Sequence, residues 1–431
     1  MIARLTYKET GSNNGIMKQR YGSSPQALIG VLCMAVYFTS YLTRMNFSVT
    51  VSEIASAEGF LKSQLGTVTT FGFVSYGVGQ LVSGYLSDTF NCRRIVFLGL
   101  AATSVFNAVL PFCSSIALMS AVWCLNGFAQ AMLWPPLVRI MTEYLPPERF
   151  SGTCALVTVA GSVGTVLIYL VAPLCITVAG WRSVFYICAL CGAAATVLWL
   201  VGSSRVVKLV RPLGAADAGM SAVKAEAGSG GDKKRSPAAL LLGGGLLPVA
   251  AAIVVQGLLR DGITTWTPSL IAETYNAENT VAIFSSVIIP LLGIAGVRIS
   301  SAVRRRLISN EIRCGGVFFA LGCLFCAALY FLRDSGMIVS AVLSGLTVGC
   351  MHGVNFMLIG ILPARFANTG RVGVVSGLLN SLTYVGSALS SYGFARLSEL
   401  YGWDFTLLSW LILLAVGTVL CFAGAKTVKS R

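Results

Sequence analysis

Long apolar stretches recur along this chain, and they limit its fold more than any other feature. One helix needs about 20 apolar residues to cross a bilayer core of about 30 Å, and about twelve stretches reach this length. They fall near residues 26–47, 66–87, 95–114, 116–141, 153–179, 183–202, 238–266, 279–302, 314–332, 336–362, 371–395 and 404–425. We therefore predict an all-α polytopic membrane protein.

The composition excludes most other classes of protein. Of the 431 residues, 55% are hydrophobic and only 11% are charged, whereas soluble chains carry about 25% charged residues. A soluble enzyme, a disordered protein, a coiled coil and a disulfide scaffold are therefore excluded. The net charge of +15 is also typical of nucleic-acid binders, so the positions of the basic residues must decide what they do.

The basic residues gather on one side of the predicted membrane. Of 31 Lys and Arg residues, 23 share the side of both termini and the central linker, four lie opposite and four lie within apolar stretches. Because cytoplasmic loops collect Lys and Arg, we expect a cell-membrane protein with both termini in the cytoplasm and no nucleic-acid partner. The expected divisions are a tail at 1–25, a six-helix bundle at 26–202, a linker at 203–237, a second bundle at 238–425 and a tail at 426–431.

Signals for metal, cofactor or enzyme chemistry are missing. The pairs Cys188 and Cys191, and Cys323 and Cys326, lie in apolar stretches without neighbouring His or carboxylate, so we interpret them as packed thiols rather than zinc ligands. No phosphate-binding G-x-x-x-x-G-K-[ST] motif occurs. We predict no metal, no cofactor, no catalytic residues and no enzyme activity.

The two halves of the chain share short motifs in the same order. Tyr-Leu-Thr-Arg at 41–44 matches Gly-Leu-Leu-Arg at 257–260, and Gly-Trp at 180–181 matches Gly-Trp at 402–403. Gly161 with Ser162 likewise matches Gly386 with Ser387. These matches predict two pseudo-symmetric repeats of six helices, an architecture that places the substrate site near the membrane midplane between the halves.

Arg44 and Arg260 occupy matching positions in the first and seventh stretches. A charged side chain at a helix centre costs about 2.5–3.5 kcal/mol on insertion scales and marks a functional pathway. Two cations facing one cavity repel each other unless an anion completes the site, and Arg pairs bidentately with phosphate or carboxylate. The alternatives are that each Arg extends to the outer interface or pairs with Asp261.

Residues 84–94 read Gly-Tyr-Leu-Ser-Asp-Thr-Phe-Asn-Cys-Arg-Arg. This segment resembles the loop between the second and third helices of the major facilitator superfamily. The resemblance implies twelve helices and a cytoplasmic gate network formed by Asp88, Arg93 and Arg94. A solvated basic loop is the alternative interpretation of these charges.

Further motifs resemble the organophosphate:phosphate antiporters of that superfamily, which include glycerol phosphate and hexose phosphate transporters. They are Tyr37, Tyr41, Arg44, Asn46 and Phe47, Trp134-Pro-Pro with Arg139, Arg260-Asp-Gly-Ile-Thr-Thr-Trp-Thr-Pro268, Met357-Leu-Ile-Gly360 and Tyr384-Val-Gly386. The resemblance implies that Arg44 and Arg260 grip a phosphate while Tyr37, Tyr41 and Tyr384 line the cavity. Ordinary packing between helices is the alternative role for these tyrosines.

Two positions depart from the family pattern. Gln80 stands where the family often has lysine, and Gly161 stands where the glycerol phosphate transporters have histidine. Without these positive groups the case for a doubly charged phosphate monoester is weaker, and a singly charged anion remains open.

Two further ionisable residues lie in apolar stretches. His352, the only histidine, either faces the cavity as a proton-sensitive donor or hydrogen-bonds between helices. Asp261 either neutralises Arg260 until substrate displaces it or carries a proton.

The leading hypothesis is a secondary transporter that exchanges a phosphorylated metabolite for inorganic phosphate by alternating access. Its expected partners are a small anionic substrate and the lipid bilayer, and we expect a monomer. A proton-coupled symporter of a carboxylate or other small anion is the first alternative. A transporter-like protein that senses an anion without moving it is the second.

Overall fold

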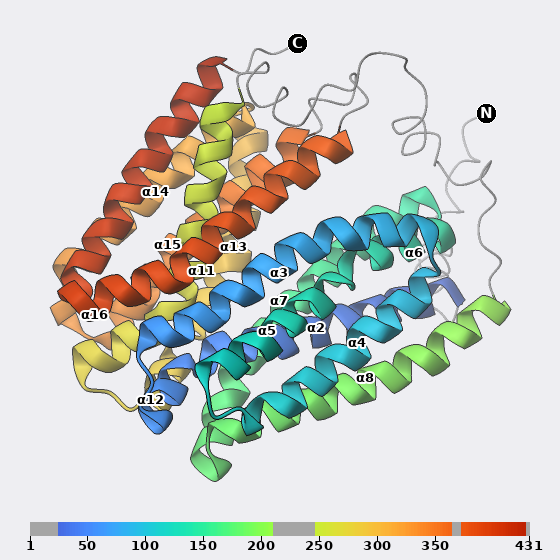
Figure 1. Cartoon of the computed structure of the whole chain (residues 1–431). Helices are drawn as coiled ribbons and strands as arrows, with labels where there is room; N and C mark the ends of the chain where they lie inside the picture. The colour runs from blue at the N-terminus through green and yellow to red at the C-terminus, as the bar shows by residue number, and fades with distance from the viewer. Residues whose placement is uncertain (1–24, 210–245, 364–371, 428–431) are drawn as a thin grey trace, which may run out of the picture.

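The computed structural model describes residues 25–209, 246–363 and 372–427, which form helices and contain no strand. Two helical bundles meet on one side and diverge toward the side where α2 begins and α16 ends (Figure 1). The first comprises α2 (Pro25–Glu58), α3 (Lys62–Thr89), α4 (Cys92–Val109), α5 (Ile116–Ala131), α6 (Trp134–Tyr144), α7 (Pro147–Ala179) and α8 (Trp181–Leu209). The second comprises α11 (Leu247–Tyr275), α12 (Asn279–Ser285), α13 (Ile288–Arg306), α14 (Glu311–Leu332), α15 (Met337–Asn355), the π-helix Phe356–Ile361 and α16 (Val372–Thr427).

Ten of the described helical segments are long and apolar enough to cross a membrane. The count is lower than the predicted twelve for two reasons. The 28-residue α3 is rich in Ser, Thr and Gly, which lowers its hydropathy although it is long enough to span. The 56-residue α16 contains two passes. Gly402 interrupts it with a φ of 76°, which lies outside the range of a right-handed α-helix and which glycine tolerates best. The all-α membrane fold is thereby confirmed.

The first helix extends further than predicted. α2 continues to Glu58 instead of ending near residue 47, because its later polar residues are satisfied within the bundle. For example, the fully buried Thr50 donates its hydroxyl to the backbone oxygen of Asn46 over 2.8 Å. Arg44, which is close to the end of the predicted stretch 26–47, consequently lies near the middle of α2.

The seventh pass is displaced from its predicted position. α11 covers Leu247–Tyr275 instead of 238–266, since its polar segment Thr264–Thr267 is packed inside the bundle and stays helical. Arg260 therefore lies near the helix centre. α8 extends to Leu209, so the first residues of the predicted linker are helical. The remainder of the linker, residues 1–24 and residues 428–431 lie outside the described residues.

Hydrogen bonds between the bundles gather on the side opposite the start of α2, which we call the sealed side. The hydroxyls of Ser52 and Ser269 share a hydrogen bond of 2.7 Å, and Asn279 donates to Glu53 Oε2 over 2.8 Å. Thr70 donates to the backbone oxygen of Ala388 over 2.8 Å. These bonds hold α2 and α3 of the first bundle against α11, α12 and α16 of the second.

Candidate functional site

Arg44 projects from α2 into an aromatic environment. Its guanidinium carbon lies 4.4 Å from the ring centroid of Tyr41 and 5.0 Å from that of Tyr76, distances at which a cation is attracted to the ring face. Its Nε is buried without a hydrogen-bond partner. In the described part of the chain no carboxylate lies within ion-pair distance of Arg44. A buried donor that lacks a partner is unfavourable, so this guanidinium is ready to receive an anion.

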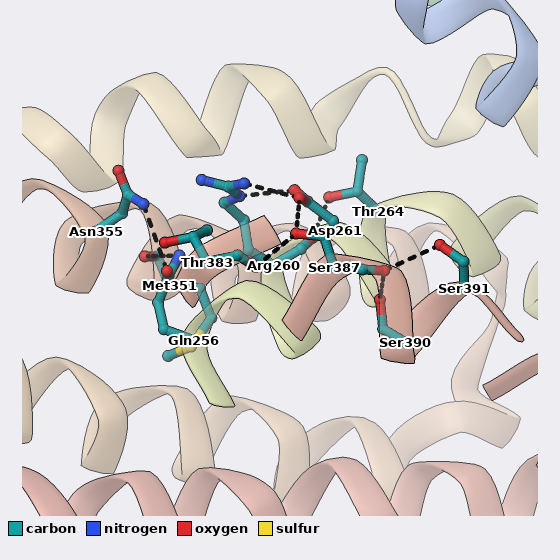
Figure 2. Close-up of polar contacts among 10 residues, drawn as sticks. All are labelled: Gln256, Arg260, Asp261, Thr264, Met351, Asn355, Thr383, Ser387, Ser390 and Ser391. Atoms are coloured by element: carbon teal, nitrogen blue, oxygen red, sulfur yellow. Dashed lines mark hydrogen bonds and ion pairs between the residues drawn. The ribbon is translucent and has the colours of Figure 1, made fainter. Parts of the chain in front are cut away.

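Arg260 on α11 is paired, in contrast to Arg44. Its Nε and Nη2 each lie 2.7 Å from an oxygen of Asp261, so the pair is bidentate. Ser387 on α16 donates its hydroxyl to Asp261 Oδ2 over 2.5 Å. Figure 2 shows the three side chains converging in this order, with Ser387 below the carboxylate. Part of the cationic surface of Arg260 is therefore already neutralised by the protein.

Polar residues of α11 continue this cluster along the helix. Gln256, one turn before Arg260, donates to the backbone oxygen of Met351 over 3.2 Å and accepts from Asn355 over 3.4 Å (Figure 2). Gln256 is fully buried, so these bonds satisfy an otherwise costly amide. They also join α11 to α15, which fixes the position from which Arg260 extends.

A buried polar network fixes the helix that carries Arg44. Gln130 on α5 accepts from the hydroxyl of Ser40 over 2.7 Å, and donates to the hydroxyls of Thr43 and Thr103 over 2.7 Å and 2.8 Å. Because Ser40 and Thr43 lie in the turn before Arg44, this network sets the position of α2 relative to α4 and α5.

Tyrosines lie near both arginines. Tyr41 and Tyr384 are each close enough to both Arg44 and Arg260 to interact with them electrostatically. The rings of Tyr76 and Tyr384, from different bundles, lie 4.8 Å apart between centroids. Tyr76 was not among the predicted site residues, although it precedes Gln80 by one turn on the same face of α3.

The position of Gly161 is closed by aromatic rings. A Cβ added there would lie 2.8 Å from the Tyr41 ring and 3.0 Å from that of Tyr37. Tyr37 also packs on Tyr41 and Trp134, at centroid distances of 5.1 Å and 4.7 Å. The two tyrosines thus fill the volume that a larger residue at position 161 would need.

His352 and Gln80 are both half-buried. His352 on α15 packs on Gly293 of α13, where an added Cβ would lie 2.9 Å from the imidazole ring. It is also near enough to Arg260 and Asp261 to interact with their charges. Gln80 lies one turn after Tyr76 on α3. Within the described residues no group of three or more His, Cys, Asp or Glu side chains is placed to hold a metal ion.

The predicted gate residues lie at the end of α3 and the start of α4. Asp88 belongs to the last turn of α3, and its side chain lies outside the described residues. Asn91 caps α4 by accepting from the backbone of Arg93 over 3.0 Å, and Arg94 is exposed. Arg139, which was not predicted for this network, donates to the backbone oxygen of Ser87 over 2.6 Å.

Two bundles of six passes, with an arginine at the centre of one helix in each, define a class of membrane transporter. Residues 33–391 match the Major Facilitator Superfamily. The chain therefore belongs to this superfamily.

Similar proteins confirm the resemblance to the organophosphate:phosphate antiporter family. The membrane sensor protein UhpC of Salmonella typhimurium is 26% identical over 372 residues, which cover 85% of this chain and 84% of that protein. A probable hexose phosphate transport protein of Chlamydia pneumoniae is 25% identical, with coverage of 85% and 84%. The glycerol-3-phosphate transporter of Bacillus subtilis is 23% identical, with coverage of 88% and 87%.

A solved structure shares the fold. The crystal structure of a bacterial homolog of the human lysosomal transporter Spinster, in an inward-facing and occupied conformation, superimposes with a TM-score of 0.77 at 14% identity. The match covers 94% of this chain and 98% of that one. At this identity the likeness concerns the fold alone.

Proposed function

We propose that this protein is a secondary active transporter that exchanges a small phosphate-bearing organic anion for inorganic phosphate. The observation that carries the proposal is the pair of arginines, one from each bundle, with Tyr41 and Tyr384 near both. An anion held between them contacts both bundles at once. Its binding therefore favours closure of the bundles around it, which is the requirement for alternating access.

Arg44 provides the recognition of phosphate. Its Nε is buried without a partner, and a guanidinium fork matches the geometry of two phosphate oxygens. A small pocket of the first bundle lies beside it and is lined by Ser48, Thr69, Tyr76 and Asn126 among others. The relatives named for hexose phosphate and glycerol-3-phosphate support a phosphorylated substrate of comparable size.

The hydrogen bonds on the sealed side support a rocking mechanism. They close the route from that side, whereas the bundles diverge toward the side where α2 begins (Figure 1). With both termini in the cytoplasm of a cell-membrane protein, as the distribution of basic residues favours, this state faces the cytoplasm. The opposite state then requires these bonds to break.

Counterflow in proteoliposomes tests the exchange. Vesicles loaded with inorganic phosphate are expected to take up labelled phosphate or glycerol phosphate much faster than empty vesicles. Equal uptake with and without internal phosphate contradicts exchange. Proton-coupled symport instead predicts that a protonophore abolishes uptake and that Asp261→Asn uncouples it.

Sensing without transport is a second candidate, because one relative is named a membrane sensor protein. This function predicts that phosphate esters bind to the purified protein while vesicles show no flux in either direction. Calorimetric binding and counterflow on the same preparation distinguish the two functions.

A further inference from the structure

The carboxylate of Asp261 lies on the guanidinium that the proposed substrate uses. Two hydrogen bonds of 2.7 Å come from Arg260 and one of 2.5 Å comes from Ser387. A phosphate that approaches Arg260 therefore meets a negative charge as well as a positive one (Figure 2).

Asp261 remains near Arg260 in every state of the transporter. The two residues are neighbours on α11, so no movement of the bundles separates their backbones. Ser387, which is fully buried on α16, holds the carboxylate from a second helix of the same bundle. Rocking of one bundle against the other leaves this arrangement intact.

The charges of the candidate site consequently amount to one net positive charge. Arg44 contributes the unpaired cation, while Arg260 and Asp261 cancel. The positions of Gln80 and Gly161 add no charge, and an imidazole such as that of His352 is neutral at about pH 8 because its ordinary pKa is about 6.5. The nearby tyrosines are neutral as well.

We propose that Asp261 restricts this site to anions with a single negative charge, such as a phosphodiester or a phosphate ester in its singly ionised form. The second charge of a phosphate dianion has no free cation to pair with and is repelled by Asp261. This inference rests on the proposed function, because it concerns the substrate of the same site. It makes Asp261 a determinant of specificity by charge.

Two probes of fixed charge test the inference on the purified full-length protein. Dimethyl phosphate carries one negative charge, whereas methyl phosphate at about pH 8 is a dianion because the second pKa of phosphate monoesters is about 6. Calorimetry gives the dissociation constant of each. We expect the wild type to bind dimethyl phosphate at least about tenfold more tightly, and Asp261→Asn to shift the ratio toward methyl phosphate by about tenfold or more.

Asp334→Asn is the matched control, because this carboxylate is 90% exposed in the turn that follows α14 and its removal changes the total charge equally. The ratio is expected to stay at the wild-type value in this variant. Tighter binding of methyl phosphate by the wild type overturns the inference, even if Asp261→Asn does not fold. An unchanged ratio in a folded Asp261→Asn overturns it as well, while the proposed function stands. If neither probe binds the wild type, both the inference and the proposed function are overturned.

Discussion

Lys62 at the start of α3 pairs with Glu273 near the end of α11, with 2.8 Å between Nζ and Oε2. This ion pair joins the two bundles on the sealed side. The indole of Trp403 donates to the same oxygen over 2.9 Å, and Lys62 Nζ lies 4.9 Å from the centroid of the Trp403 ring. The carboxylate of Glu273 thus binds both the ammonium group of Lys62 and the indole N–H of Trp403.

The first bundle contains the corresponding arrangement within itself. Glu58 accepts from the indole of Trp181 over 3.1 Å and pairs with Arg182 over 2.9 Å. Asp404 stands where the repeat would place a second such arginine, and it pairs with Arg333 instead. The second bundle therefore takes its cation from Lys62 of the first bundle, and this substitution turns a local contact into a contact between the bundles.

Lys62→Gln is expected to loosen the sealed side. Half-exposed ion pairs are worth up to about 1 kcal/mol, so amide exchange in the peptide covering residues 273–279 should rise by about fivefold. Hydrogen–deuterium exchange measured by mass spectrometry gives this value. Arg182→Gln is the control, because it removes the matching cation within one bundle and leaves the contact between bundles intact. Equal exchange in the two variants contradicts the assignment.

Arg44→Lys is expected to weaken substrate binding although it keeps the charge. A lysine lacks the planar fork, and the loss of a hydrogen bond to a charged group costs about 1.5–3 kcal/mol, so affinity for phosphate esters should fall by about 10- to 100-fold. Calorimetry on the purified protein measures the change. Arg305→Lys, at an exposed position at the end of α13, should leave affinity unchanged. Retention of full affinity by Arg44→Lys would exclude the clamp.

Gly161→Ala is expected to lower the midpoint of thermal unfolding. The added methyl group would lie 2.8 Å from the Tyr41 ring, and overpacking of this kind costs about 1–3 kcal/mol. Gly152→Ala on the same helix meets no atom within 4 Å and should be neutral or stabilising, since alanine favours helix interiors by about 0.5–1 kcal/mol over glycine. Identical midpoints for the two variants would show that the rings of Tyr37 and Tyr41 move aside without a measurable loss of stability.

Gln130→Leu is expected to destabilise the first bundle. The change leaves Ser40, Thr43 and Thr103 without their shared partner. Hydrogen bonds between membrane helices average about 0.6 kcal/mol, so the three together should cost about 2 kcal/mol. Thermal unfolding in detergent measures the loss, and Thr158→Val removes an exposed hydroxyl as a control. A midpoint equal to that of the control contradicts a stabilising role for the network.

The sequence alone determined the features that depend on local composition and on periodicity. Apolar stretches of about 20 residues predicted the passes, since a segment of that length satisfies its own backbone groups in lipid only as an α-helix. Repeated motifs placed Arg44 and Arg260 in equivalent helices. Helix ends were less predictable, because α2 and α11 continue through polar residues such as Thr50 that only burial in the bundle makes favourable.

The pairing of the charges depends on tertiary contacts that no local pattern predicts. Neighbours on a helix do not face each other by default, so the spacing of Arg260 and Asp261 left their pairing open until Ser387, 126 residues away, was found on the same carboxylate. Tyr76 likewise became recognisable as a site residue only from its ring contact with Tyr384 of the other bundle. The ion pair of Lys62 with Glu273 also crosses from one bundle to the other. These contacts join residues distant in the chain, and their geometry follows from how the two bundles pack rather than from any local pattern.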